Sequence, residues 1–78
     1  MRLEIVTPDK TIFEGEASLV QLPGLDGLFE VLNHHMPMIA GLKKGKVKVI
    51  DASNKENFYE INGGVIEVLN NKVMVLAQ

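Results

Sequence analysis

The residues best suited to chemistry in this chain are two adjacent histidines, His34 and His35. Neighbouring side chains on a strand point to opposite faces of a sheet, so the pair is poorly placed to chelate one metal ion. A site would need two or three further ligands from Asp26, Glu30 or Glu67, whose spacing matches no metal motif. We therefore expect no metal site. A loop histidine bonded to nearby backbone and a histidine that faces a partner remain alternative interpretations.

Other catalytic patterns are equally weak. Neither of the two serines, Ser18 and Ser53, has the glycines of a nucleophile elbow around it. Most of the ten acidic residues, such as Glu4 and Glu60, occupy alternating strand positions that are expected to face water. The absence of cysteine excludes thiol catalysis, disulfides and zinc–thiolate sites. The sequence thus predicts a non-catalytic chain with no cofactor and no small-molecule substrate.

Two turns have a superficial likeness to ligand sites. Residues 24–27 (Gly-Leu-Asp-Gly) lack the lysine and the following helix of a phosphate loop, so their glycines are expected to supply positive φ. Residues 43–45 (Lys-Lys-Gly) could form the hairpin tip of a biotinyl or lipoyl carrier domain. Such carriers resemble one another around Met-Lys-Met, but here Pro37 stands between the two methionines. A carrier domain and a freestanding metal-dependent β-barrel enzyme remain the alternatives.

Apolar residues in and beside turns point instead to docking. They are Leu25, Leu28, Met36 and Met38, and burying all four in the chain's own core would be difficult. Loop apolar residues beside a rigid sheet commonly mark a protein interface. The pattern therefore predicts a surface that binds other polypeptides.

Size and charge narrow the class further. With 78 residues, 46% of them hydrophobic, the chain is expected to form one domain over residues 1–78. The net charge of −2 gives no reason to bind nucleic acid. The first residues, with Glu4 and Pro8, do not resemble a signal peptide, and no apolar run approaches the roughly 20 residues of a membrane span.

The hydrophobic period is two almost throughout, which indicates strands. Asn70-Asn71 suits a two-residue hairpin turn, Lys44-Gly45 suits a second tight turn, and Gly63-Gly64 suits a corner where one long strand bends. We predict an all-β fold, a small antiparallel β-sandwich or flattened barrel of about 8–10 short strands.

With these motifs identified, the chain resembles the N-terminal β-sandwich domain of the epsilon subunit of F-type ATP synthases. Four stretches carry the resemblance: residues 6–9 (Val-Thr-Pro-Asp) with 13–15 (Phe-Glu-Gly), residues 22–27 (Leu-Pro-Gly-Leu-Asp-Gly), residues 35–45 (His-Met-Pro-Met-Ile-Ala-Gly-Leu-Lys-Lys-Gly), and residues 61–68 (Ile-Asn-Gly-Gly-Val-Ile-Glu-Val) with 71–77 (Asn-Lys-Val-Met-Val-Leu-Ala). Three positions depart from the family pattern: Glu30 replaces a usual glycine, and Asn33-His34 replaces a usual Pro-Gly.

The resemblance implies a non-catalytic central-stalk subunit that couples rotation of a proton- or sodium-translocating c-ring to the gamma subunit. It implies a peripheral position on the cytoplasmic face of the bacterial inner membrane. The family's C-terminal helical domain, an inhibitory arm in relatives, has no counterpart in these residues. The c-ring-facing residues would be Gly24, Leu25, Asp26, Gly27, Leu28 and Glu30. The gamma-facing residues would be Thr7, His35, Met38 and Ala40.

Overall fold

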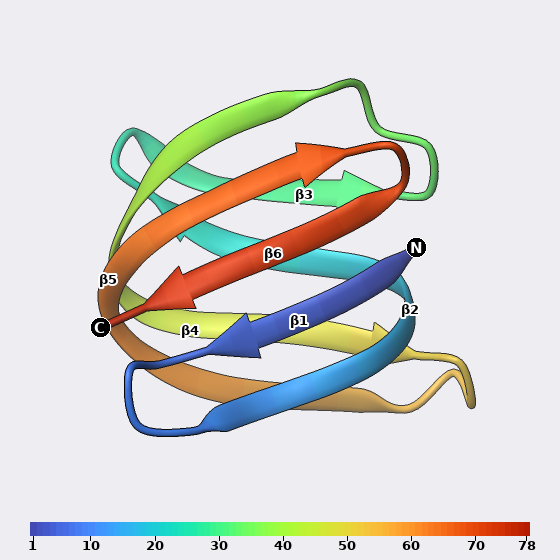
Figure 1. Ribbon diagram of the computed structural model, residues 1–78, viewed down its shortest axis with the longest axis horizontal. Helices are drawn as coiled ribbons and strands as arrows, with labels where there is room; N and C mark the ends of the chain where they lie inside the picture. Colours follow the sequence, from blue (N-terminus) through green and yellow to red (C-terminus); the bar gives the residue numbers. More distant parts are fainter.

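The computed structural model describes residues 1–78 and consists of strands joined by turns, without a helix (Figure 1). The six strands are β1 (Arg2–Val6), β2 (Thr11–Gly24), β3 (Gly27–Leu32), β4 (Met38–Asp51), β5 (Glu56–Leu69) and β6 (Lys72–Ala77). The all-β fold predicted from the period-two hydrophobicity is therefore confirmed. No helical segment with the length and apolar character of a membrane span is present.

The strands form one sheet in the order β1-β6-β5-β4-β2-β3, and an added β1–β2 pairing closes five of them into a flattened barrel (Figure 1). Every ladder is antiparallel except β1–β6, which is parallel. The structure has six strands rather than about 8–10, because β2, β4 and β5 are each 14 residues long. Each of these long strands bends and contributes to more than one part of the sandwich.

Local backbone preferences explain the corner and the hairpin at the C-terminal end of the chain. β5 continues through Gly63 and Gly64, whose φ angles of 120° and 146° are rarely adopted by other residues. Asn70 and Asn71 have φ angles of 51° and 60° and join β5 to β6, as expected for a tight hairpin turn. Both predictions are confirmed.

The predicted turn at Lys44-Gly45 is wrong, because β4 runs without interruption through both residues. Gly45 lies opposite Ile61 in the β4–β5 ladder. A Cβ added at Gly45 would lie 2.8 Å from the Cβ of Pro23. The glycine therefore leaves room for Pro23 where the β2–β4 ladder is irregular, and it is a residue of close approach rather than of chain reversal.

A single apolar core fills the space inside the sandwich. Its buried members alternate with outward residues along the strands, as the period of two requires. They are Met1, Leu3, Ile5, Ala17, Val20, Leu22, Val31, Leu42, Val47, Val49, Ile61, Ile66, Val68, Val73, Val75 and Ala77. No charged or polar side chain is buried among them. This close-packed core makes the sandwich a stiff support for whatever its outer surface does.

The β4–β5 turn is organised by the carboxylate of Asp51. Its oxygens accept hydrogen bonds from the backbone N–H of Lys55 at 3.0 Å, from the backbone N–H of Ser53 at 2.9 Å and from the Asn57 amide at 3.2 Å. The bond from the Lys55 backbone is the largest cause that holds the pKa of Asp51 below its ordinary value. Burial is the next largest and opposes it, and the bonds from Ser53 and Asn57 lower the pKa further.

Replacing Asp51 with asparagine is expected to lower the melting temperature at pH 7 by a small amount, on the order of 2 °C. The folded-state pKa of Asp51 is lowered, so its carboxylate contributes stability above the unfolded-state pKa of about 4 and loses it as the pH falls through the lower folded value. The gap between wild type and variant should therefore close below about pH 4. Thermal unfolding followed by circular dichroism from pH 7 to pH 2 measures it, and a gap that stays constant would contradict the role given to the charge.

Candidate functional site

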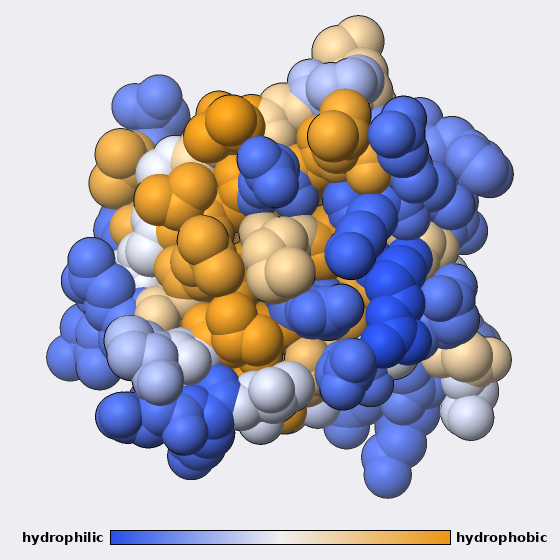
Figure 2. Space-filling view, in the orientation of Figure 1, coloured by the Kyte–Doolittle hydropathy of each residue, from blue (hydrophilic) through white to orange (hydrophobic).

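An exposed apolar surface lies on the outer side of the sheet where β4 begins and β5 ends. We call it the apolar face and define it by Leu25, Ile39, Val65, Leu69 and Leu76, all of which are exposed. Figure 2 shows apolar side chains gathered on the side where β5, β6 and β1 face the viewer, with hydrophilic residues around them. Several large apolar side chains exposed together on a small domain indicate an interface.

Strand register places Val65 and Leu76 in one row, while Ile39 and Leu69 lie beside it in the rows of Glu67 and Lys72. Val65 lies opposite Gly41 on β4 and opposite Leu76 on β6, and Leu76 lies opposite Val6 on β1. Leu25 extends the row beyond Gly41. Its N–H donates to the Gly41 carbonyl at 3.2 Å, and a Cβ at Gly41 would lie 2.7 Å from the Leu25 Cδ1. The row therefore runs across β1, β6, β5 and β4 to the β2–β3 turn.

The β2–β3 turn carries the predicted c-ring-facing residues, most of which are exposed. Gly24 is buried at the end of β2 and lacks the expected positive φ, whereas Gly27 has a φ of 130°. Leu25 and Leu28 are 64% and 69% exposed, and Asp26 projects between them. Glu30 follows on β3, also exposed, where its carboxylate accepts a hydrogen bond from the Gln21 amide at 3.0 Å. The turn thus presents two apolar side chains and two acids to solvent.

A groove of about 250 Å³ separates this turn from the start of β4. It is lined by Gly24, Leu25, Asp26, Gly27, Leu28 and Phe29 from the hairpin, and by Met38 and Ala40 from β4. The structure therefore brings the predicted c-ring-facing turn and two of the predicted gamma-facing residues to one place on the surface.

Met38 and Ala40 are not free outer residues, although Met38 was expected to be exposed. They lie opposite Val68 and Ile66, which are core residues, and both are partly buried against the core. Ile39, between them, points outward and is 72% exposed. The sequence from Met36 to Ala40 is apolar without alternation, so it gave no signal for choosing Ile39 over its neighbours.

The histidines lie in the loop between β3 and β4 rather than on a strand. The Nδ1 atom of His35 is 2.7 Å from the Met36 carbonyl oxygen, which fits a loop histidine bonded to nearby backbone. The backbone N–H of His34 donates to the Asn71 side-chain oxygen at 2.7 Å, so this loop is tied to the β5–β6 turn. No three of the histidine and acidic side chains gather closely enough to hold a metal ion.

Thr7 and His35 lie near opposite ends of the apolar face. Thr7 follows β1 at the end of the sandwich where the C-terminus lies, and the His35 loop lies at the end where the N-terminus lies (Figure 1). The Thr7 hydroxyl accepts hydrogen bonds from the N–H groups of Asp9 and Lys10 and donates to the Lys10 carbonyl. It is therefore a turn residue beside the face rather than a member of it.

The lysine turn required by the carrier alternative does not exist. Lys43, Lys44 and Gly45 all lie within β4, where Lys44 and Gly45 are paired with β5. The two lysine side chains are exposed on the strand and have no hairpin tip to present them. The structure therefore gives no support to a biotinyl or lipoyl attachment site.

These features define a small all-β domain with an exposed apolar face. A family described as ATP synthase, Delta/Epsilon chain, beta-sandwich domain, matches residues 1–78. The chain is 44% identical over 77 residues to the ATP synthase epsilon chain of Chlorobium limicola, which covers 99% of this chain and 88% of that one. It is 46% identical over 76 residues to the epsilon chain of Chlorobaculum tepidum, covering 97% and 86%. The chain therefore belongs to the ATP synthase delta/epsilon chain family.

Solved structures share the fold. One is a chain of the mitochondrial ATP synthase of Euglena gracilis, in an assembly of OSCP, F1 and c-ring, with a TM-score of 0.88 and 23% identity over 96% of this chain. Another comes from the central stalk and c-ring of the Tetrahymena thermophila enzyme, with a TM-score of 0.82 and 19% identity over the whole chain. The present chain spans 48% and 63% of those two chains.

Proposed function

We propose that this chain is a non-catalytic subunit of the central stalk of an F-type ATP synthase and couples rotation of the c-ring to the gamma subunit. The observation that carries the proposal is the apolar face, a group of exposed leucine, isoleucine and valine side chains on the outside of the closed sheet. Because the chain belongs to the delta/epsilon family, the ATP synthase is the complex in which we expect this face to be covered.

The gamma subunit is the partner we assign to the apolar face. Thr7 and His35 would then lie near its two ends. Met38 would be reached through the depression that it lines together with Pro37, Ile39 and Leu69. Ala40 would be covered together with the groove beneath Leu25. The four gamma-facing residues of the sequence prediction thus surround the surface that we propose gamma covers.

The c-ring is the partner we assign to the β2–β3 turn, residues 24–28, with Glu30 beside it. Leu25 belongs to both surfaces and would lie at the boundary between the two partners. Asp26 and Glu30 can pair there with basic side chains of the ring loops, although an exposed pair contributes only about 0–1 kcal/mol. The turn adjoins the apolar face through the contact of Leu25 with Gly41, so force entering at one surface is carried to the other by a short, rigid path. In a bacterium, this position lies on the cytoplasmic face of the inner membrane.

The proposal predicts that the purified chain binds purified gamma subunit in a saturable one-to-one complex and does not hydrolyse ATP by itself. Isothermal titration calorimetry measures the first, and a phosphate-release assay measures the second. Burial of the apolar face should give a negative heat-capacity change of binding. A chain that fails to bind gamma, and that does not co-purify with the ATP synthase from solubilised membranes, would exclude this function.

A further inference from the structure

One charge lies within the apolar face without an ion-pair partner. Along the end of β5, Val65, Glu67 and Leu69 point outward while the residues between them are buried. Register places Glu67 opposite Ile39 on one side and Met74 on the other. None of the ion pairs in the structure includes Glu67. A carboxylate is thus surrounded by the side chains that a partner would cover.

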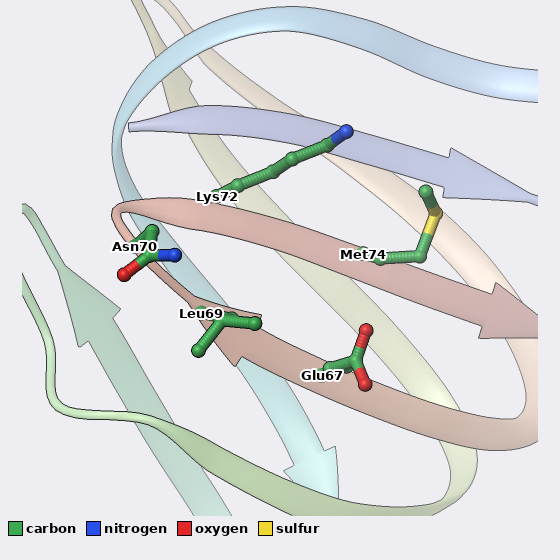
Figure 3. A pocket seen from close by; sticks show the side chains of 5 residues that line it. All are labelled: Glu67, Leu69, Asn70, Lys72 and Met74. Atoms are coloured by element: carbon green, nitrogen blue, oxygen red, sulfur yellow. The ribbon is translucent and has the colours of Figure 1, made fainter.

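Two depressions meet at Glu67. One, of about 290 Å³, is lined by Glu67, Leu69, Asn70, Lys72 and Met74 (Figure 3). The other, of about 420 Å³, is lined by Pro37, Met38, Ile39, Glu67, Val68 and Leu69. The carboxylate therefore lies on the ridge between two hollows, with room on both sides for a long side chain of a partner.

The nearest cation does not neutralise Glu67. Lys72 lies diagonally across the β5–β6 ladder, because Leu69 is its direct partner and Met74 is the direct partner of Glu67. In Figure 3 the Lys72 side chain extends from β6 toward β1. Glu67 lies on β5, on the side of β6 that faces away from β1. No contact within 4 Å joins the two groups.

Covering this face with an apolar partner alone would strip water from an unpaired carboxylate, which is strongly unfavourable. A partner that binds here must therefore bring a cation to Glu67. Arginine fits better than lysine, because its planar guanidinium bonds a carboxylate through two parallel hydrogen bonds. Its aliphatic stem can also lie along Ile39 and Leu69, which flank the two depressions.

We propose that Glu67 is the specificity-determining residue of the docking face and receives an arginine side chain of the gamma subunit. This inference rests on the proposed function, since it assigns a chemical role within the same interface. The apolar face contributes most of the affinity. Glu67 fixes the orientation of the partner and disfavours binding of any partner that has no cation at this position.

The test is Glu67→Gln, which removes the charge and keeps the shape of the side chain. Binding to gamma should weaken by about tenfold to a hundredfold, as expected for loss of a charged hydrogen-bond partner. The salt dependence of the binding constant should also become shallower. Glu60→Gln is the matched control, since Glu60 is an exposed glutamate on the other leg of β5, beyond the Gly63–Gly64 corner. It should bind gamma like the wild type.

Phenylglyoxal labelling of gamma identifies the partner group. One arginine should be protected by the wild-type chain and not by Glu67→Gln, as read by mass spectrometry. Protection of no arginine, or wild-type affinity of Glu67→Gln while Ile39→Glu fails to bind, would overturn this inference and leave the proposed function intact. Absence of binding by the wild type would remove both. Equal losses of melting temperature in Glu67→Gln and Lys72→Gln would show an internal ion pair instead, whereas we expect Glu67→Gln to melt like the wild type.

Discussion

Replacing Gly64 with alanine is expected to lower the free energy of unfolding by at least about 3 kcal/mol, a large part of the stability of so small a domain. Gly64 has a φ of 146°, and a Cβ there would lie 2.2 Å from the Leu76 carbonyl oxygen and 3.0 Å from the Ala77 Cα. Both obstacles are backbone of β6, so they cannot move without breaking the ladder that pairs Gly64 with Ala77. Urea unfolding followed by circular dichroism measures the loss.

Gly27 provides the control for this substitution. Its φ of 130° is also unfavourable for alanine, but a Cβ there would meet nothing within 4 Å. Gly27→Ala is therefore expected to cost only the backbone strain, about 1 kcal/mol. Equal losses in the two variants would show that the approach of β6 to the corner is not what makes Gly64 necessary.

The corner and the hairpin could be predicted from the sequence because they depend on local backbone conformation. Glycine and asparagine adopt positive φ more readily than other residues, so the adjacent pairs Gly63-Gly64 and Asn70-Asn71 indicated where the chain bends or turns. Gly45 could not be interpreted in the same way. Its role is to let Pro23 of another strand approach, and that contact exists only once β2 and β4 have paired.

Some of the exposed apolar residues could be predicted for a similar reason. Leu25, Leu28 and Met36 lie in or next to turns, where a side chain has little core to enter, and all three are exposed. The choice between Met38 and Ile39 depends on the register of β4 against β5, since a shift of one residue exchanges the two faces of a strand. An unbroken apolar run contains no information about that register.

The same dependence on register explains why the position of Glu67 within the apolar face could not be predicted from the sequence. In the sequence it is one of several acids at alternating strand positions, and it drew notice only as a possible metal ligand. Its position between Ile39 and Met74 is set by two ladders formed with distant parts of the chain. Residues whose role comes from neighbours on other strands are those that a single sequence does not reveal.

Replacing Ile39 with glutamate is expected to weaken binding to gamma by at least about thirtyfold, the loss typical of a well-buried interface anchor. The substitution places a second carboxylate opposite Glu67, in the middle of the surface that gamma would dehydrate. Because Ile39 is 72% exposed in the free chain, the melting temperature of the Ile39→Glu variant should differ little from that of the wild type. Calorimetric titration with gamma and thermal unfolding of the free variant measure the two effects.

Two further variants distinguish an effect on the apolar face from the general effect of adding an acidic side chain. Phe58→Glu makes the same kind of change at an exposed apolar residue on the other leg of β5 and should bind gamma normally. Met38→Glu should lower the melting temperature, because Met38 is partly buried against the core. If Phe58→Glu weakened binding as much as Ile39→Glu, the partner would have to cover the opposite leg of the sandwich, and the apolar face defined by Ile39 would not be the docking surface.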